Sequence, residues 1–229
     1  MSIIKTKHLS YHYIRHDEEG NVEGEVPAVK DVNLSVEPGE FIAILGHNGS
    51  GKTSLADALL FKAGAVDRLG KTIDGTTVCD FDSEEIKRKI SINAALASFD
   101  YEETKINLID TPGLFDFAGE MEEGIYASDT VMITVSAKSG VKTGTKKAYA
   151  SAVRAGKSKM FAVTKIDDEN ANFYNVLTEL KTVFGPTVCP IVVPVIENEK
   201  IVSYVNLIEM KVYNCLLYTS PSPRDGATS

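Results

Sequence analysis

The chain has 229 residues, of which 43% are hydrophobic and 24% charged, and its formal net charge is -8. These values allow one buried core, with or without an appendage, and argue against a general nucleic-acid-binding surface, which needs clustered positive charge. There is no run of 18 apolar residues and no secretory signal at the start, so we expect a cytoplasmic protein without a transmembrane helix. Cys79, Cys189 and Cys215 form no Cys-x-x-Cys pair, so neither a zinc site nor a disulfide framework is implied.

The first part of the chain predicts a pair of antiparallel strands. Residues 3–13 and 28–36 alternate apolar and polar side chains, and the charged, glycine-containing residues 15–25 connect them. A turn is expected at residues 37–40, followed by a short buried strand at 41–45.

The remainder alternates strand and helix patterns after a long polar segment. Apolar residues at helical spacing predict a first helix at 53–62, and residues 65–89 read as a long loop, which is typical of functional or mobile segments. Further strands are expected at 91–99, 105–110, 131–136 and 160–163, and further helices at 117–127, 145–155 and 172–184. This alternation predicts an α/β fold with a parallel sheet. Strands return in residues 188–213, and residues 214–229 are expected to be disordered.

A glycine-rich string follows the strand at 41–45 and precedes the first helix. It matches G-x-x-x-x-G-K-[ST] at every fixed position: Gly46-His47-Asn48-Gly49-Ser50-Gly51-Lys52-Thr53. Its glycines let backbone N–H groups surround a phosphate at the positive end of a helix. Lys52 is expected to reach the β- and γ-phosphates and the Thr53 hydroxyl to bind Mg²⁺, whereas His47 and Asn48 fit ordinary loop positions.

Two more short motifs lie where predicted strands end. Asp110-Thr111-Pro112-Gly113 fits the D-x-x-G element of GTPases, in which the Asp holds Mg²⁺ through water and the Gly N–H contacts the γ-phosphate. Thr164-Lys165-Ile166-Asp167 is similar to the N-K-x-D element that reads guanine. Alone, the first could be a strand-end turn and the second an exposed charged pair. Together, at strand ends of a parallel sheet, they predict one ligand site.

From about residue 46 to 213 the chain resembles the GTPase domain of elongation factor G, and in particular its divergent bacterial paralogues. The resemblance extends over the helix at 53–64, a first switch at 83–94 and an insert at 172–210. It implies a translational-GTPase fold that hydrolyses GTP with Mg²⁺. The implied metal ligands are Thr53, Ser91 and Asp110, and Lys52 and Gly113 would act on the γ-phosphate. The remaining implied nucleotide contacts come from the phosphate loop, Thr164, Lys165 and Asp167.

The chain departs from this family at several motif positions. The family's D-T-P-G-H ends in Leu114 here, so the histidine that orients water is absent. R-G-I-T becomes Arg88-Lys89-Ile90-Ser91, and Thr164 stands for the Asn of N-K-x-D. The S-A-[LK] guanine element and the ribosome-contacting domains do not occur in the sequence. We therefore expect slow hydrolysis.

Residues 1–52 resemble instead the start of an ABC-transporter ATPase of the energy-coupling-factor type. The shared features are two strand sequences, at 9–13 and 29–34, and the turn before the phosphate loop. In that family an aromatic equivalent to Tyr13 stacks on adenine, although an exposed strand aromatic explains Tyr13 as well. The chain has no L-S-G-G-Q signature, and Asp110 at the strand end is followed by Thr111 instead of the Glu of a Walker B motif, so ABC chemistry is not expected.

The two resemblances meet within residues 45–52 and predict a chimera. The expected parts are an ABC-like strand pair at 1–45, a truncated GTP-binding domain at 46–213 and a tail at 214–229 that resembles translated sequencing-adapter read-through. Guanine nucleotide is the expected ligand, and the resemblance implies the ribosome as partner. The alternatives are an ATP-binding fragment of an ABC transporter, with membrane partners, and a nucleotide-binding module without turnover.

Overall fold

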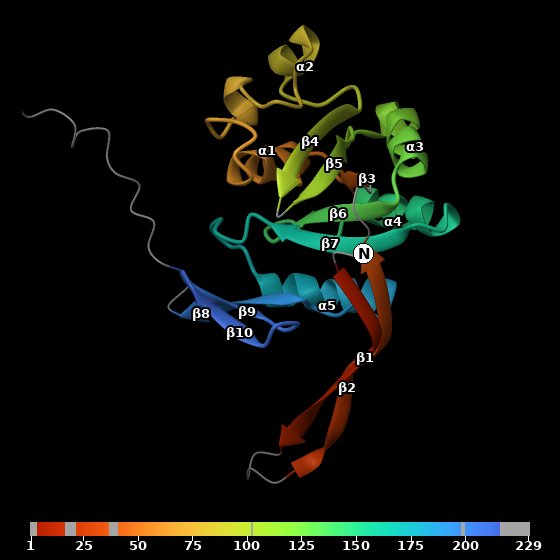
Figure 1. Ribbon diagram of the computed structural model, residues 1–229, viewed down its shortest axis with the longest axis vertical. Helices are drawn as coiled ribbons and strands as arrows, with labels where there is room; N and C mark the ends of the chain where they lie inside the picture. The colour runs from red at the N-terminus through yellow and green to blue at the C-terminus, as the bar shows by residue number, and fades with distance from the viewer. Residues whose placement is uncertain (1–3, 17–21, 37–40, 102, 198–199, 216–229) are drawn as a thin grey trace, which may run out of the picture. The chain divides into compact units, whose positions relative to one another are not determined.

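The computed structural model describes residues 4–16, 22–36, 41–101, 103–197 and 200–215. Contacts divide the chain into two units, Met1–Thr187 and Val188–Ser229. The first unit holds a two-stranded and a five-stranded sheet, and the second holds a three-stranded sheet (Figure 1). The predicted turn at residues 37–40 and most of the predicted disordered tail lie outside the described residues.

The N-terminal strand pair is present as the sequence predicts. β1 (Ile4–His16) and β2 (Val22–Val36) are antiparallel, and they form a sheet of their own. Both strands are longer than expected, because each takes in part of the charged segment assigned to the connection. The pairing shifts register at four places, which interrupts a strict alternation of faces.

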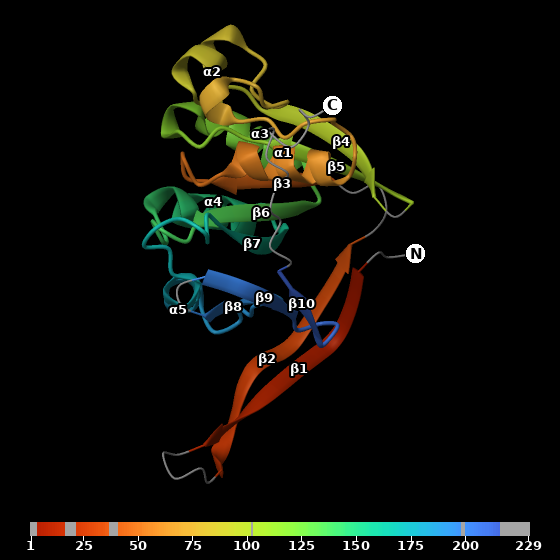
Figure 2. The ribbon, with the colours of Figure 1, turned by 90° about the vertical axis from the view of Figure 1, so that its left-hand side faces the viewer.

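The central sheet has the strand order β4-β5-β3-β6-β7 (Figure 2). Four of its strands are parallel to one another: β5 (Thr104–Asp110), β3 (Phe41–Gly46), β6 (Thr130–Ser136) and the edge strand β7 (Ser158–Thr164). β4 (Ala95–Tyr101) lies antiparallel to β5. The predicted α/β fold is confirmed, and the parallel strands bring their carboxyl ends to one edge of the sheet.

Helices cover both faces of this sheet. α1 (Lys52–Lys62) contacts β3, β4 and β5, whereas α3 (Ala118–Ala127) and α4 (Thr143–Arg154) contact β3 from the other side. The period-2 pattern of β3 explains this division, since Ala43 and Leu45 face α3 and α4 while Ile44 faces α1.

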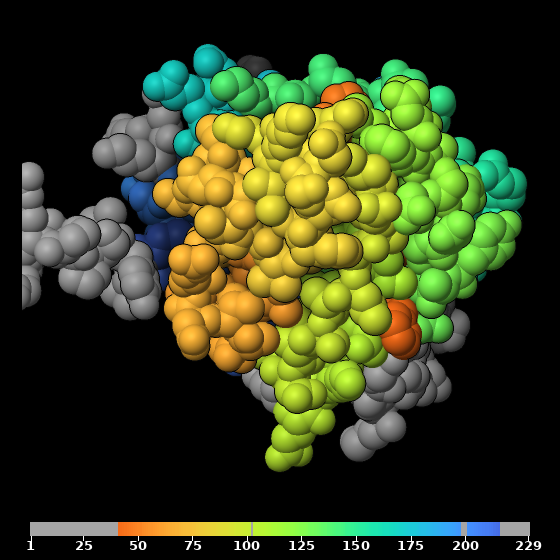
Figure 3. Space-filling view, turned by 90° about the horizontal axis from the view of Figure 1, so that it is seen from above, coloured from red at the N-terminus to blue at the C-terminus, as the bar shows by residue number. Residues whose placement is uncertain are grey.

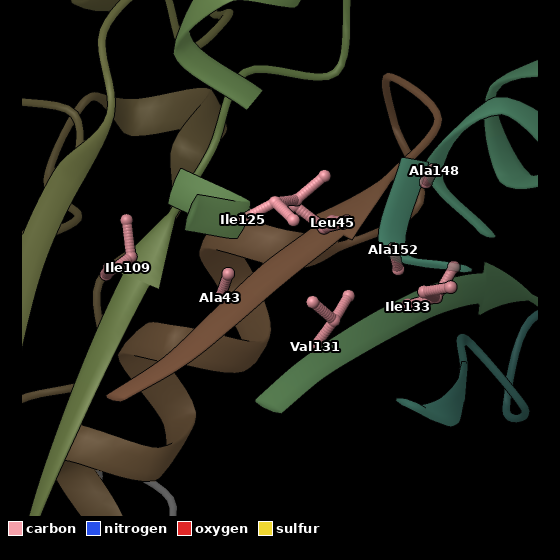
Figure 4. Packing of buried hydrophobic residues seen from close by; sticks show 8 residues of the cluster. All are labelled: Ala43, Leu45, Ile109, Ile125, Val131, Ile133, Ala148 and Ala152. Atoms are coloured by element: carbon pink, nitrogen blue, oxygen red, sulfur yellow. The ribbon is translucent and has the colours of Figure 1, made fainter. Parts of the chain in front are cut away.

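The core on the α3–α4 face is built from small and branched side chains that leave little space. Figure 4 shows Ala43 and Leu45 of β3 beside residues of the flanking strands and helices, Ile109, Ile125, Val131, Ile133, Ala148 and Ala152. All but Ile109 are fully buried, and Ile109 is 8% exposed. Burying each branched aliphatic side chain contributes about 1.5–3 kcal/mol. This core fixes the strand ends from which the site is built.

α5 (Phe173–Phe184) is joined to α4 and β7 by three aromatic rings. The Phe184 ring lies 4.4 Å from that of Tyr149 and 5.1 Å from that of Phe161, measured between centroids. The Asn172 side chain caps the helix by accepting from the Asn175 N–H at 3.0 Å. α5 therefore packs at the side of the sheet where β7 is the last strand.

The segment predicted as a long loop, residues 65–89, contains two helices and is held to α1. These are η1 (Thr72–Asp74) and α2 (Ser83–Arg88), and the segment covers much of the face in Figure 3, in orange to yellow. The Asp57 carboxylate on α1 is buried and accepts hydrogen bonds from the N–H groups of Gly70 (2.5 Å) and Val78 (2.9 Å). The expected long loop thus contains two short helices that were not predicted.

The strand predicted at 91–99 begins only at Ala95, because side chains take the preceding N–H groups. Glu85 accepts from Ile92 and Asn93, and Glu120 accepts from Ala94 at 2.8 Å. These residues therefore cannot use the same N–H groups in a sheet ladder.

The second unit is a sheet of the order β10-β9-β8, and its strands are antiparallel. They are β8 (Val192–Glu197), β9 (Lys200–Asn206) and β10 (Lys211–Asn214). The strands expected in residues 188–213 are confirmed. None of the helices in the described ranges is long and apolar enough to span a membrane.

Candidate functional site

The glycine-rich string joins the end of β3 to the start of α1, as its sequence predicts. Gly51, with φ 85°, caps α1 in the left-handed conformation that suits glycine. A Cβ at Gly46 would lie 2.5 Å from the Thr134 Oγ1, so no side chain fits there. Ser50 is buried and its hydroxyl pairs with that of Thr134 at 2.6 Å. The loop is thereby fixed between β3 and β6.

Lys52 is buried within this loop. Its Nζ donates to the carbonyl oxygens of Gly46 at 3.2 Å and His47 at 3.4 Å. Burial lowers the pKa of Lys52, while the nearby carboxylates of Asp110 and Asp80 act in the opposite direction. An anionic phosphate in the loop would favour the charged form of this lysine.

Three oxygen-bearing side chains from separate elements meet at the start of α1. The Thr53 hydroxyl donates to Asp110 Oδ2 at 2.6 Å and lies 3.2 Å from the Ser91 hydroxyl. Asp110 Oδ1 is buried and has no hydrogen-bond partner in the described ranges. Burial raises the pKa of Asp110 to about 6, although Thr53 and Lys52 oppose that effect.

This oxygen cluster fits a hard divalent cation. Mg²⁺ prefers oxygen ligands and is usually held by one or two protein groups together with phosphate and water. A cation would satisfy the orphaned Asp110 Oδ1 and favour its ionised form. The described residues contain no group of three or more His, Cys, Asp or Glu side chains that could hold a metal ion.

The Asp80 carboxylate lies beside this cluster and adds a fourth oxygen-bearing side chain. No sequence pattern indicated this residue. Its Oδ1 accepts from the Ser91 hydroxyl at 2.9 Å and its Oδ2 from the Thr77 hydroxyl at 3.0 Å. Asp80 is only 3% exposed. It holds the Ser91 side chain next to Thr53.

A cleft of about 160 Å³ opens over the phosphate loop. Its lining combines the loop and α1 with residues of three other segments: Asn48, Gly49, Gly51, Lys52, Thr53, Ser54, Thr72, Lys89, Ile90, Ser91, Gly113 and Lys165. Gly113 approaches the loop closely, since a Cβ there would lie 2.5 Å from Lys52 Nζ and 2.7 Å from the Asn48 nitrogen. The backbone of Gly113 thus lies beside Lys52 and the phosphate loop.

The segment after β7 lies at the same edge of the sheet, but only part of it approaches the phosphate loop. The Thr164 hydroxyl donates to the Ser50 carbonyl oxygen at 2.6 Å, so it contacts the loop directly. Lys165, with φ 54°, lines the cleft. Asp167 is exposed and does not line it. His47 is also exposed, with its Nδ1 2.5 Å from the Asn48 carbonyl oxygen.

The structure also shows residues whose role the sequence did not reveal. Glu85 is buried and caps α2 together with Asp82. The pattern from Asp82 to Glu85 is a capping-box signature, so α2 was detectable from sequence. The contacts of Asp57 with Gly70 and Val78, and of Asp80 with Ser91, join residues too far apart in the chain for a local pattern to identify.

The whole arrangement matches a known family. The model of the elongation factor Tu GTP binding domain matches residues 39–217. The chain belongs to this family. It is a GTP-binding domain of the translational GTPase type, and ATP binding of the ABC type is not favoured.

Several curated proteins are similar to this GTP-binding domain. An elongation factor G-like protein of Mycobacterium tuberculosis is 39% identical over 153 residues, which cover 67% of this chain and 21% of that protein. One from Thermotoga maritima is 36% identical and covers 75% of this chain and 24% of its own length. The mitochondrial ribosome-releasing factor 2 of Culex quinquefasciatus is 35% identical, covering 73% and 22%. The domain thus spans about a fifth to a quarter of these relatives.

Solved structures agree on the fold. A crystal structure of a protein from Thermus thermophilus superposes with a TM-score of 0.73 and 35% identity, covering 76% of this chain and 26% of that one. A bacterial selenocysteine-specific elongation factor gives a TM-score of 0.50 at 25% identity, covering 62% and 23%. The fold of a translational GTPase is therefore shown.

Proposed function

We propose that this chain binds GTP together with Mg²⁺ and hydrolyses it slowly, as the GTPase domain of a translation factor related to elongation factor G. The observation that carries the proposal is the cluster at Thr53, Asp110 and Ser91, in which Asp110 Oδ1 is buried without a described partner. The cluster lies beside a phosphate loop whose Lys52 faces Gly113. Family membership supports guanine as the base.

Each residue of the site has a proposed role that follows from its position. Backbone N–H groups of residues 46–53 would surround the phosphates, and Lys52 would neutralise charge on the β- and γ-phosphates. Thr53, Ser91 and Asp110 would hold Mg²⁺, which supplies charge neutralisation when bound. Gly113 would donate its N–H to the γ-phosphate. Positioning and electrostatics of this kind dominate catalysis of phosphoryl transfer.

Guanine recognition is assigned to the segment after β7. The Asp167 carboxylate would accept from the ring N1–H and the 2-amino group, and Lys165 would pack its stem along the base. Adenine has a lone pair where guanine has N1–H, so the same carboxylate would reject it. A site built on such hydrogen bonds discriminates by up to about 10⁴-fold, and Thr164 in place of Asn should reduce that here.

Competition against labelled GDP tests this assignment. We expect GDP to displace the label far better than ADP, and Asp167→Asn to weaken GDP and strengthen xanthosine diphosphate. Asp168→Asn is the matched control, because Asp168 is an equally exposed neighbour. Equal displacement by ADP and GDP would reject guanine specificity, and an unchanged Asp167→Asn variant would remove Asp167 from the site.

The proposals for the protein's partner and its cellular location are based on the similar proteins. The similar proteins include an elongation factor G-like protein and a ribosome-releasing factor, which supports the ribosome as the partner of the parent factor. We also propose that the protein is located in the cytoplasm. Co-sedimentation of the chain with ribosomes, with GDP and with a GTP analogue, would test the partnership.

For the N-terminal segment we propose an origin in an ABC-type ATPase, joined to the GTP-binding domain within residues 45–52, and for residues 214–229 an added tail. The proposed parts are 1–45, 46–213 and 214–229. The separate hydrogen bonding of β1 and β2 supports only a division between the strand pair and the central sheet, whose strand β3 begins at Phe41. Deleting residues 1–38 should leave GDP affinity nearly unchanged. A deletion that abolishes binding would show one functional unit, and long-read sequencing across codons 40–60 would test the join itself.

A further inference from the structure

Three consecutive basic residues, Lys87, Arg88 and Lys89, lie at the C-terminal end of α2, and only the third lines the cleft. Lys87 and Arg88 both pair with Glu84, at 3.8 Å and 2.9 Å, on an exposed side of the helix. Lys89 lines the cleft over the phosphate loop. In the described part of the chain its ammonium group has no hydrogen bond or ion pair. A free cation is thus left at the cleft.

The backbone of Lys89 is unusual for this type of residue. Its φ is 56° and its ψ 41°, and its N–H closes α2 by donating to the Glu85 carbonyl oxygen. Left-handed backbone costs a residue with a Cβ about 1 kcal/mol, so glycine is usual at such a helix end. The presence of lysine here in spite of that cost motivates the search for a role of its side chain.

The place of Lys89 in the chain determines which part of a nucleotide it can reach. Ser91 is two residues further on, and its hydroxyl lies 3.2 Å from that of Thr53. Two residues span at most about 7 Å, and the lysine stem adds several more ångströms of reach. Lys165 lies on the segment assigned to the base, whereas Lys89 shares its segment with Ser91 at the metal and terminal-phosphate side of the cleft.

We propose that Lys89 is a further ligand of the terminal phosphate and makes the cleft prefer nucleoside triphosphate over diphosphate. This rests on the proposed function, because it requires a nucleotide in the same cleft. The γ-phosphate brings extra negative charge to a cleft whose lining residues Thr53 and Ser91 are already hydrogen-bonded to the carboxylates of Asp110 and Asp80. A flexible ammonium group at the rim offsets that charge only when the third phosphate is present.

The test uses the full chain and four proteins: wild type, Lys89→Asn, Lys89→Arg and Lys87→Asn. Asparagine tolerates the left-handed backbone and removes the charge, whereas arginine keeps the charge. Lys87→Asn removes a cation from the same helix on the side of Glu84. Affinities for GDP and for a non-hydrolysable GTP analogue are measured with Mg²⁺ by fluorescence, at low and high salt.

Lys89→Asn should weaken binding of the analogue about tenfold and that of GDP less than about twofold, since hydrogen bonds to charged groups contribute this much. Lys89→Arg and Lys87→Asn should keep the wild-type ratio of the two affinities. An unchanged ratio in Lys89→Asn, or an equal change in Lys87→Asn, overturns the inference while the proposed function stands. Wild-type protein that binds neither nucleotide overturns both.

Discussion

The hydroxyl of Thr164 at the end of β7 donates a hydrogen bond of 2.6 Å to the carbonyl oxygen of Ser50 in the phosphate loop. This threonine stands in place of the asparagine of the family's N-K-x-D element. The structure retains the contact to the loop. A Cβ placed on Gly51 would lie 3.5 Å from the same Thr164 oxygen, so the two segments are in close contact.

Removing this hydroxyl should loosen the loop. Thr164→Val keeps the shape of the side chain but leaves the Ser50 carbonyl without this donor, so we expect a loss of about 1 kcal/mol in the free energy of unfolding. GDP affinity should fall as well. Urea denaturation and GDP titration measure the two effects, with Thr164→Ser as the control that keeps the hydroxyl. Equal stability of the Val and Ser variants would contradict this role.

Leu114 follows Gly113 directly and has no polar side-chain atom with which to orient water. Removing such a catalytic group typically costs about 10²-fold in rate, or roughly 3 kcal/mol. Leu114→His should therefore raise single-turnover GTP hydrolysis by about that factor while GDP affinity stays the same. Leu114→Asn shows whether polarity alone suffices. Wild-type protein that turns over as fast as the His variant would refute this explanation of slow hydrolysis.

Glu85 holds the segment that carries Ser91. Its carboxylate accepts hydrogen bonds from the N–H groups of Ile92 (2.9 Å), Asn93 (3.0 Å) and Asp82 (3.1 Å), and the residue is 1% exposed. In Glu85→Gln one of the two acceptor oxygens becomes a donor, so at least one of these N–H groups loses its partner. We expect a loss of about 2 kcal/mol in the free energy of unfolding.

Hydrogen exchange separates this effect from a general loss of charge. The amides of Ile92 and Asn93 should exchange much faster in Glu85→Gln. Glu84→Gln is the matched control on the same helix, because its ion pairs with Lys87 and Arg88 are exposed and contribute little. Equal exchange in the two variants would show that Glu85 does not position this segment.

Cys79 reports on the packing of residues 65–89. Burial raises the pKa of its thiol to about 12, and the carboxylates of Asp110 and Asp80 add to that effect. Its thiolate fraction at pH 8 is then about 10⁻⁴, and only the thiolate is reactive. Iodoacetamide should alkylate Cys79 at least about 10²-fold more slowly than the exposed Cys215, as followed by mass spectrometry.

The same thiol gives a sign for the pH dependence of stability. The folded chain keeps the Cys79 proton up to about pH 12, whereas the unfolded chain releases it near the ordinary value of 9.0. The free energy of unfolding should therefore fall as pH rises above 9. Similar alkylation rates for Cys79 and Cys215 at pH 8 would show that the segment opens readily.

Much of the fold follows from local sequence patterns. The apolar strand before Gly46 and the helical spacing after it are short-range features, and they place Lys52 and Thr53 correctly. The antiparallel direction of β4 was also accessible, because the two residues between Tyr101 and Thr104 are too few for a parallel crossover.

The meeting of Thr53 with Asp110 was foreseeable, since parallel strands end at one edge of a sheet. The hydrogen bonds that the carboxylates of Asp57, Asp80 and Glu85 accept were not foreseeable from the sequence. Each carboxylate accepts hydrogen bonds from a segment that has no regular period, and such pairings depend on tertiary packing. Outside α2, whose capping box is a local pattern, the path of residues 65–89 depends on these long-range contacts, which is why the sequence suggested a long loop there.

The two hydrogen bonds to Asp57 have a consequence for regulation. Asp57 lies one helical turn after Thr53, so α1 connects the proposed nucleotide site to the backbone at Gly70 and Val78. A molecule that binds residues 70–78 and favours their contact with α1 would then be thermodynamically linked to the nucleotide. By reciprocity, the factor by which it changes nucleotide affinity must equal the factor by which the nucleotide changes its own affinity.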